Sequence, residues 1–292
     1  MKTRILGFVA LAAVIGAAIN GLFLVPADLN QGDAQRIMYV HVASAWIAYA
    51  SFGVTALAGL GYLIWRDLRL DALALAGAEV GVMFTAFAIW GGMMWGRPVW
   101  GVYWQWEDPR LTTTALLLAL YVGYLLLRRL TDDPARRAAR AAVVGLIAAV
   151  DIPIVHFSVI WWRGLHQGPT IGDPSKILHP SAPLLFVMAL LAMLGAFTLV
   201  WVYLLIRRYQ LARLDWQRED DVRRGRVEAA RHCDRWRDGR RGARGMTDAG
   251  FVIAAYGVIL GGIALYAAWL ARRLRIARES VRRRDADVDE AG

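Results

Sequence analysis

The chain has 292 residues, of which 58% are hydrophobic and 20% are charged, and its formal net charge is +10. The charges cluster in short blocks between apolar runs long enough to cross about 30 Å of hydrocarbon as helices. This pattern excludes a soluble globular domain. The basic excess is mostly arginine near the C-terminus, which favours contact with membrane lipid and argues for no nucleic-acid partner. The single cysteine, Cys233, excludes an internal disulfide and a cysteine-based metal cluster.

Seven apolar segments are predicted to span a membrane as helices: 5–25, 38–65, 72–94, 111–127, 141–162, 184–206 and 251–270. The first is predicted to be a retained helix, because its apolar core is longer than the usual signal-peptide core. The predicted fold class is therefore an all-α polytopic membrane protein. It has a six-helix transmembrane bundle (residues 1–206) and a seventh C-terminal span.

Lysine and arginine predict the orientation of the first six spans. With the N-terminus inside, nine of these residues lie in the inner connections and five in the longer outer ones. Three unusual stretches then share the outer face: the start of the second span, the connection after the third span and the segment after the fifth span.

The connection after the third span reads WGRPVWGVYWQWEDPRLT (95–112). Asp108 and Pro109 are predicted to be the N-cap and the first residue of the fourth span. Glycines in this loop would let the backbone approach a neighbour closely. An interfacial aromatic belt and a platform for a flat ligand both remain open as explanations. The loop, taken as 95–110, contributes these candidate binding residues: Trp95, Gly96, Trp100, Gly101, Trp104, Trp106 and Asp108.

Two histidines lie in aromatic surroundings at the predicted outer face. His41 stands between Tyr39 and Trp46, and His166 follows Trp161-Trp162-Arg163. A neutral imidazole is a usual axial ligand of haem iron, and aromatic planes with a nearby arginine suit a macrocycle that carries carboxylates. Each histidine could instead be an interfacial or packed residue.

The other histidines are weaker candidates. His156, in the fifth span, is predicted to be a packed polar residue but stays open as a functional group, as does Glu79 in the third span. His179 is assigned no role, and His232 is predicted to be solvated.

The tryptophan loop, MYVHVASAW (38–46) and FSVIWWRGLHQGPT (157–170) together resemble the haem-handling WWD-domain membrane proteins, most closely the CcmC family of cytochrome c maturation. The resemblance covers roughly residues 1–206. It implies that His41 and His166 are the axial ligands of haem b and that the tryptophan loop is its platform. Arg97, Arg110 and Arg163 are candidate propionate partners by position and charge.

The resemblance also implies a function that is not enzymatic. The protein would bind haem at the periplasmic face of the bacterial inner membrane and deliver it to a CcmE-like haem chaperone, with CcmA/CcmB-like ABC transporter subunits as further partners. An intramembrane b-type cytochrome and a permease for another amphipathic solute are the alternatives. Glu107 interrupts the Trp–Asp pair of the family pattern, and Ala43 stands where the family often has proline.

The C-terminal region differs in character from the first 206 residues. Residues 207–245 carry 13 arginines and are predicted to be a solvated or disordered linker. Residues 246–292 contain one apolar span and a basic tail, and resemble CcmD, the small single-span partner. We interpret the chain as a fusion of the two components, with a plain seventh helix as the alternative. Arginines flank both ends of the span 251–270, so its direction stays open.

Overall fold

The computed structural model describes residues 2–131, 133–162, 164–166, 183–223, 257, 260–276 and 278–279. Within these residues the chain is helical without β-strands, and six helices are long and apolar enough to cross a membrane. The predicted fold class, an all-α multi-pass membrane protein, is confirmed. The helices are α1 (Lys2–Ile19), a π-helix (Asn20–Leu24), a 3-10 helix (Asp33–Arg36), α2 (Ile37–Trp65), α3 (Leu68–Trp100), α4 (Pro109–Arg129), α5 (Pro134–Ala149), α6 (Asp151–Trp161) and α8 (Leu184–Arg223).

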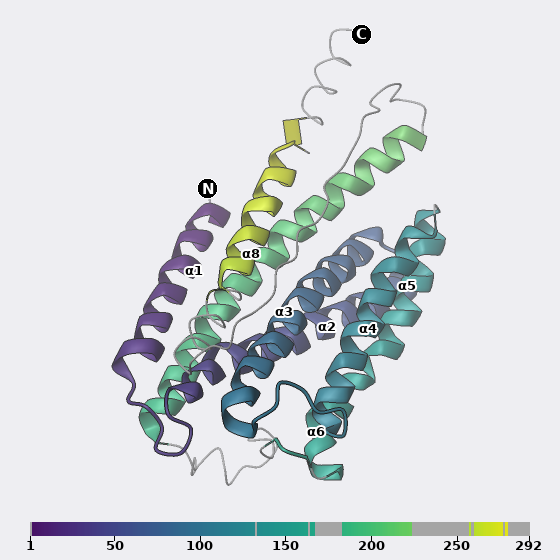
Figure 1. Cartoon of the computed structure of the whole chain (residues 1–292). Helices are drawn as coiled ribbons and strands as arrows, with labels where there is room; N and C mark the ends of the chain where they lie inside the picture. The colour runs from purple at the N-terminus through teal and green to yellow at the C-terminus, as the bar shows by residue number, and fades with distance from the viewer. Residues whose placement is uncertain are drawn as a thin grey trace, which may run out of the picture.

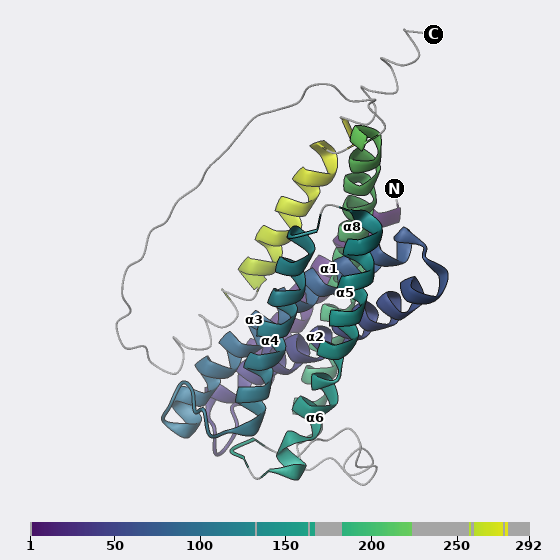
Figure 2. The ribbon, with the colours of Figure 1, turned by 90° about the vertical axis from the view of Figure 1, so that its right-hand side faces the viewer.

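The helices form an elongated bundle with α2 and α3 at its centre (Figure 1). Helices α4, α5 and α6 pack on one side of this pair, and α8 packs on the other side and connects it to α1. The turns α2–α3 and α4–α5 lie at one end of the bundle, which we call the arginine end. The segments 101–108 and 164–166 lie at the opposite end (Figures 1 and 2), which we call the loop end.

Three helices begin at an aspartate whose carboxylate accepts a hydrogen bond from a backbone N–H of the first turn. Asp67 caps α3, Asp108 caps α4 and Asp133 caps α5, with N···O distances of 2.8, 3.0 and 2.8 Å. Pro109 and Pro134 occupy the first helical position, where a missing N–H has no consequence. The predicted N-cap at Asp108 is therefore confirmed.

The fifth predicted span is divided into α5 and α6 at Val150. Pro153 explains the break, because it has no N–H to donate to the carbonyl of Ala149 and its ring collides with that carbonyl in a regular helix. Helix α6 continues toward the loop end, where it precedes His166.

Gly77 marks the closest approach of α3 to α2. A Cβ atom at this position would lie 2.7 Å from the carbonyl oxygen of Ser51 and 2.7 Å from Oγ1 of Thr55. The Thr55 hydroxyl also lies 3.2 Å from the carbonyl oxygen of Ala74 on α3. The two central helices therefore approach closely enough for a side chain of α2 to hydrogen-bond the backbone of α3.

Gly77→Ala is expected to lower the free energy of unfolding by about 1–3 kcal/mol, because the added methyl group forces α2 and α3 apart. Gly53→Ala on α2 is the matched control, since nothing lies within 4 Å of an added Cβ there. It should be neutral or slightly stabilising, since alanine favours a helix by roughly 0.5–1 kcal/mol. Equilibrium unfolding in mixed micelles measures both values, and equal effects would contradict the close packing.

Two elements extend further than the sequence indicates. Helix α3 continues through Pro98 to Trp100, so the tryptophan loop is reduced to residues 101–108. Helix α8 continues to Arg223, so the first part of the expected 207–245 linker is helical. Arg208 is buried and pairs with Glu79 of α3 through two contacts, of which the one from Nη2 of Arg208 to Oε1 of Glu79 measures 2.6 Å. Residues 224–245 lie outside the described residues.

The seventh span lies partly outside the described residues, and residues 260–276 form a helix that we call the C-terminal helix. Gly262 lies against the ring of Phe87, and Arg278 donates a hydrogen bond to Gln210 of α8 at 3.0 Å. These contacts and Figure 1 show the C-terminal helix running parallel to α8 and ending at the arginine end. In a simple alternating seven-span order it would run antiparallel to α8.

Candidate functional site

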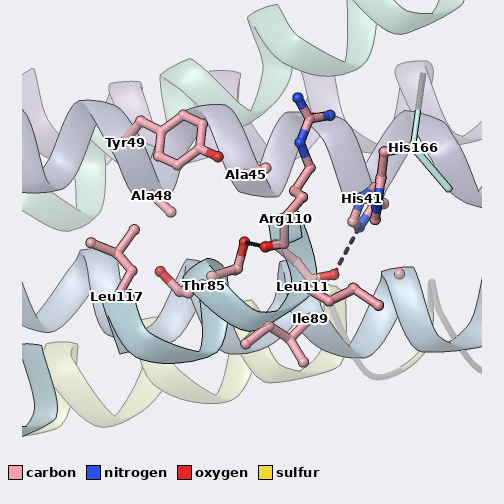
Figure 3. Close-up of a pocket in the computed structure, with 13 residues that line it drawn as sticks. His41, Ala45, Ala48, Tyr49, Thr85, Ile89, Arg110, Leu111, Leu117 and His166 are labelled. Carbon is pink, nitrogen blue, oxygen red and sulfur yellow. Dashed lines mark hydrogen bonds between the residues drawn. The ribbon is translucent and has the colours of Figure 1, made fainter. Parts of the chain in front are cut away.

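His41 and His166 line the same cavity at the loop end (Figure 3). The first comes from α2 and the second from the segment after α6. The cavity has a volume of about 60 Å³, which is room for a few water molecules. Its other lining residues are mostly small, apolar or hydroxyl-bearing: Ala45, Ala48, Tyr49, Thr85, Ala88, Ile89, Gly92, Arg110, Leu111, Thr114 and Leu117.

The imidazole of His41 is held against the backbone of α3. Its Nδ1 lies 2.7 Å from the carbonyl oxygen of Ala88 (Figure 3). Because a carbonyl only accepts hydrogen bonds, Nδ1 carries the proton and Nε2 keeps its lone pair for a ligand. A Cβ atom at Gly92 would lie 2.9 Å from Cε1 of the ring. Glycine at position 92 therefore permits this placement of the ring.

Asp108 holds His166 in the corresponding way. The buried carboxylate of Asp108 lies 3.1 Å from Nδ1 of His166 and accepts hydrogen bonds from the N–H groups of Leu165 at 2.8 Å and Leu111 at 3.0 Å. One side chain thus caps α4 and fixes the segment 164–166 to it. Gly164 permits the contact, since a Cβ there would lie 2.7 Å from Oδ2 of Asp108.

The Asp108 carboxyl is ionised at neutral pH. Burial by itself raises its pKa, but the hydrogen bonds from His166, Leu111 and Leu165 outweigh burial and lower the pKa to about 2. A carboxylate on Nδ1 fixes the tautomer of an imidazole and raises the basicity of Nε2. His41 and His166 therefore each present Nε2 as the atom able to bind a metal.

Two tryptophans at the end of α3 extend the site. The ring of Trp100 lies edge-on to the ring of His166, with 4.8 Å between the ring centres. The rings of Trp95 and Trp100 are also edge-on, with 4.6 Å between their centres. Nε1 of Trp95 donates to Gln31 at 3.0 Å, which fixes this stack. Gly101 then ends α3 with φ of +80°, a conformation that favours glycine. The candidates Trp95 and Trp100 are thus helical rather than part of a loop.

None of the candidate tryptophans lines the cavity itself, and four of them lie further from the histidine pair in two edge-on pairs. Trp104 and Trp106 meet edge-on at 5.3 Å, and Trp106 is 68% exposed. Trp161 and Trp162 are each more than half exposed and meet at 5.8 Å. Gly96 permits the carbonyl of Val102 to approach α3, because a Cβ at position 96 would lie 3.1 Å from that oxygen. We call the four tryptophans at the loop end, Trp104, Trp106, Trp161 and Trp162, the aromatic rim.

The three candidate arginines differ in position. Arg110 lines the cavity (Figure 3), and it donates a hydrogen bond to the carbonyl of His156 at 3.1 Å. Arg97 instead donates to the carbonyl of Gly101 and lies over the ring of Tyr103. Arg163 lies outside the described residues. Arg110 is therefore the candidate arginine that the structure places beside the histidine pair.

The other acidic and histidine candidates lie elsewhere. Glu107 is exposed, so Asp108 is the acid that contacts a histidine. His156 packs edge-on against Trp46 at 6.1 Å and does not line the cavity. His179 and His232 lie outside the described residues. Within the described part of the chain, no group of three or more His, Cys, Asp or Glu residues is arranged to hold a metal ion.

A family model described as Heme exporter protein C (CcmC) matches residues 1–224, which include both histidines and Asp108. The chain belongs to the heme exporter protein C family. Its relatives include proteins of that name from Bradyrhizobium diazoefficiens, 42% identical over 70% of this chain and 77% of the relative, and from Haemophilus influenzae, 33% identical over 76% and 87%. A mitochondrial relative from Arabidopsis thaliana, named as a putative cytochrome c biosynthesis ccmC-like protein, is 35% identical over 55% of this chain and 60% of the relative.

In this member of the heme exporter protein C family, three parts of the site were not predicted from the sequence: the carbonyl of Ala88, Gly92 and Gly164. The carbonyl of Ala88 has no signature, because every residue carries one. Gly92 and Gly164 matter for what they lack, and their signal was present in the strings WGGMMWG and WWRGLH. The C-terminal helix lies beyond the range that the family model matches.

Proposed function

We propose that the protein binds haem b between His41 and His166 and passes it to a haem chaperone. Its family supports a role in haem export and cytochrome c maturation, a transport function rather than an enzymatic one. The observation that carries the proposal is the matched hydrogen bonding of the two imidazoles. Each Nδ1 is engaged by an oxygen, and both rings line one cavity.

The ligand set suits haem iron better than a free metal ion. Protein sites for zinc ions use three or four protein ligands, whereas the porphyrin of haem already supplies four nitrogens. Two imidazoles then complete the coordination of the iron. Arg110 lies where a cation could pair with a propionate, and exposed tryptophans of the rim offer faces for the macrocycle.

Haem is cargo in this proposal, so the site has to open and close. The cavity of about 60 Å³ is too small for a macrocycle, and the two histidines are held unequally. His41 is part of α2, whereas His166 lies in a non-helical segment that Asp108 fixes to α4. The segment 164–166 is therefore the side that moves when haem enters or leaves.

The partners and the location follow from the family resemblance and complete the proposal. We infer a CcmE-like chaperone and CcmA/CcmB-like ABC transporter subunits as partners. The loop end faces the periplasm of a bacterial inner membrane. The arginine-rich turns at the opposite end support this orientation through the positive-inside rule.

Titration of the purified full chain with ferric haem tests the proposal. The wild-type protein is expected to give the absorption spectrum of six-coordinate low-spin haem. Asp108→Asn should weaken haem binding about 10–100-fold, because the neutral amide no longer orients and polarises His166 as a carboxylate does. Glu107→Gln, at the exposed neighbouring position, should bind as the wild type does.

The two possible failures of this titration have different meanings. A wild-type protein that binds no haem would refute the proposed function. Wild-type affinity in Asp108→Asn would leave the function intact and remove Asp108 from the site.

A further inference from the structure

A second cavity lies at the arginine end of the bundle. Its volume is about 700 Å³, which falls within the roughly 300–1,000 Å³ typical of ligand-binding clefts. Residues of α3, α4, α5, α8 and the C-terminal helix line it, and we call it the arginine-end cleft. Figures 1 and 2 show the end of α4, the start of α3 and the end of the C-terminal helix at this end. Asp71 and Glu79 both line the cleft, which therefore extends about 12 Å along α3.

The charges that line the cleft are arranged unequally. Asp71 is paired with Arg128 through two contacts of 2.5 and 2.7 Å, and Glu79 is paired with Arg208. These pairs neutralise two of the three carboxylates that line the cleft, and the third is Asp215 of α8. Arg208 and the lining arginines Arg128, Arg129 and Arg137 together outnumber the three carboxylates by one. Arg129 lines the cleft without a hydrogen bond or ion pair to any part of the chain that the structure describes. Its guanidinium is thus available to an anion.

A second cation and apolar walls complete the cleft. Arg137, in the first turn of α5, lines it together with Arg129. Leu75 and Leu125 provide apolar surface deeper along the helices, and Trp216 and Trp269 provide aromatic surface. Tryptophan favours the headgroup level of a bilayer, and arginine at this level contacts lipid phosphate. The cleft therefore combines arginines at its rim with an apolar interior.

Haem and phospholipids are both anionic amphiphiles, and the lining residues favour a phospholipid. They include no histidine, cysteine or methionine, so the cleft lacks the usual axial ligands of haem iron. The hydroxyl of Tyr266, which could also ligate iron, is buried. A phospholipid needs no such ligand, because its phosphate binds arginine and its acyl chains bind apolar surface.

We propose that the arginine-end cleft binds an anionic phospholipid. Its phosphate contacts Arg129 and Arg137, and an acyl chain lies along Leu75 and Leu125. The lipid fills the space between α4 and the C-terminal helix and so joins the C-terminal helix to the rest of the bundle. This site is distinct from the histidine pair and does not depend on haem binding.

Native mass spectrometry of the full chain, purified in mild detergent and titrated with phosphatidylglycerol, tests the proposal. The double variant Arg129→Gln/Arg137→Gln should bind this lipid about 30-fold more weakly, given the contribution of two arginines near a lipid surface. Arg136→Gln is the matched control, because Arg136 is exposed in the same turn and does not line the cleft. Unchanged binding in the double variant would overturn the proposal.

A second variant separates loss of lipid from loss of fold. Leu75→Trp/Leu125→Trp fills the apolar wall and leaves the arginines in place, so it should lose phosphatidylglycerol while retaining the helical circular dichroism of the wild type. Inorganic phosphate and ferric haem are offered in parallel. Displacement of the lipid by millimolar phosphate alone would show a site for the phosphate group only, and preferential binding of haem would show a haem site; either result would overturn the assignment to a phospholipid.

Discussion

His41→Ala and His166→Ala are each expected to convert six-coordinate haem into a five-coordinate form and to lower the affinity at least about 100-fold. This is beyond the 10–100-fold effect of a residue that only orients a ligand. The expectation follows from the geometry of the pair, because each ring has Nδ1 engaged and Nε2 available. Absorption spectroscopy of the purified variants, titrated with ferric haem, measures both the coordination and the affinity.

The corresponding glycine variants, His41→Gly and His166→Gly, should differ in their rescue by free imidazole. The His166 ring lies in a non-helical segment at the loop end, next to the exposed residues Gly164 and Leu165, so imidazole should enter the space left by His166→Gly readily. His41 projects from α2 against α3, and His41→Gly should need more imidazole. His156→Ala is the control, since His156 packs against Trp46 away from the cavity. Wild-type spectra in both alanine variants would refute the assignment of the pair.

The six spans could be predicted because each needs a long apolar run, and such runs are visible in composition. The ends of the spans were less predictable. Helix α8 continues past the expected boundary, and Arg208 in this continuation is paired with Glu79, 129 residues away in sequence. An arginine in a charged segment is typical of a solvated linker, and its buried partner cannot be recognised from the segment itself.

The histidine pair, Asp108 and the tryptophans were accessible from the sequence because their side chains carry the chemistry. The hydrogen-bond partners of the two histidines could not be predicted. The sequence could not indicate that Asp108 holds His166 while a backbone carbonyl holds His41, because that depends on how α2, α3 and α4 pack. Glu107 was an ambiguity of the sequence that exposure resolves, since the buried neighbour makes the contacts.

Arg128→Met is expected to lower the free energy of unfolding by about 3–5 kcal/mol, because it leaves the carboxylate of Asp71 buried without its partner. The side chains of Arg128 and Asp71 are 7% and 11% exposed, and their two contacts measure 2.5 and 2.7 Å. The guanidinium also lies 5.7 Å from the ring centre of Tyr124. Equilibrium unfolding in mixed micelles gives the size of the loss.

The double variant Asp71→Leu/Arg128→Met distinguishes an unpaired charge from lost packing. Replacing both members of a buried ion pair by apolar residues is often neutral or stabilising, by about 1–4 kcal/mol. The double variant should therefore regain most of the stability that Arg128→Met loses. Arg136→Met, at an exposed position on α5, should leave stability unchanged. If the double variant is as unstable as the single one, the loss comes from the shape and packing of Arg128, and the ion pair is not what joins α3 to α4 at the arginine end.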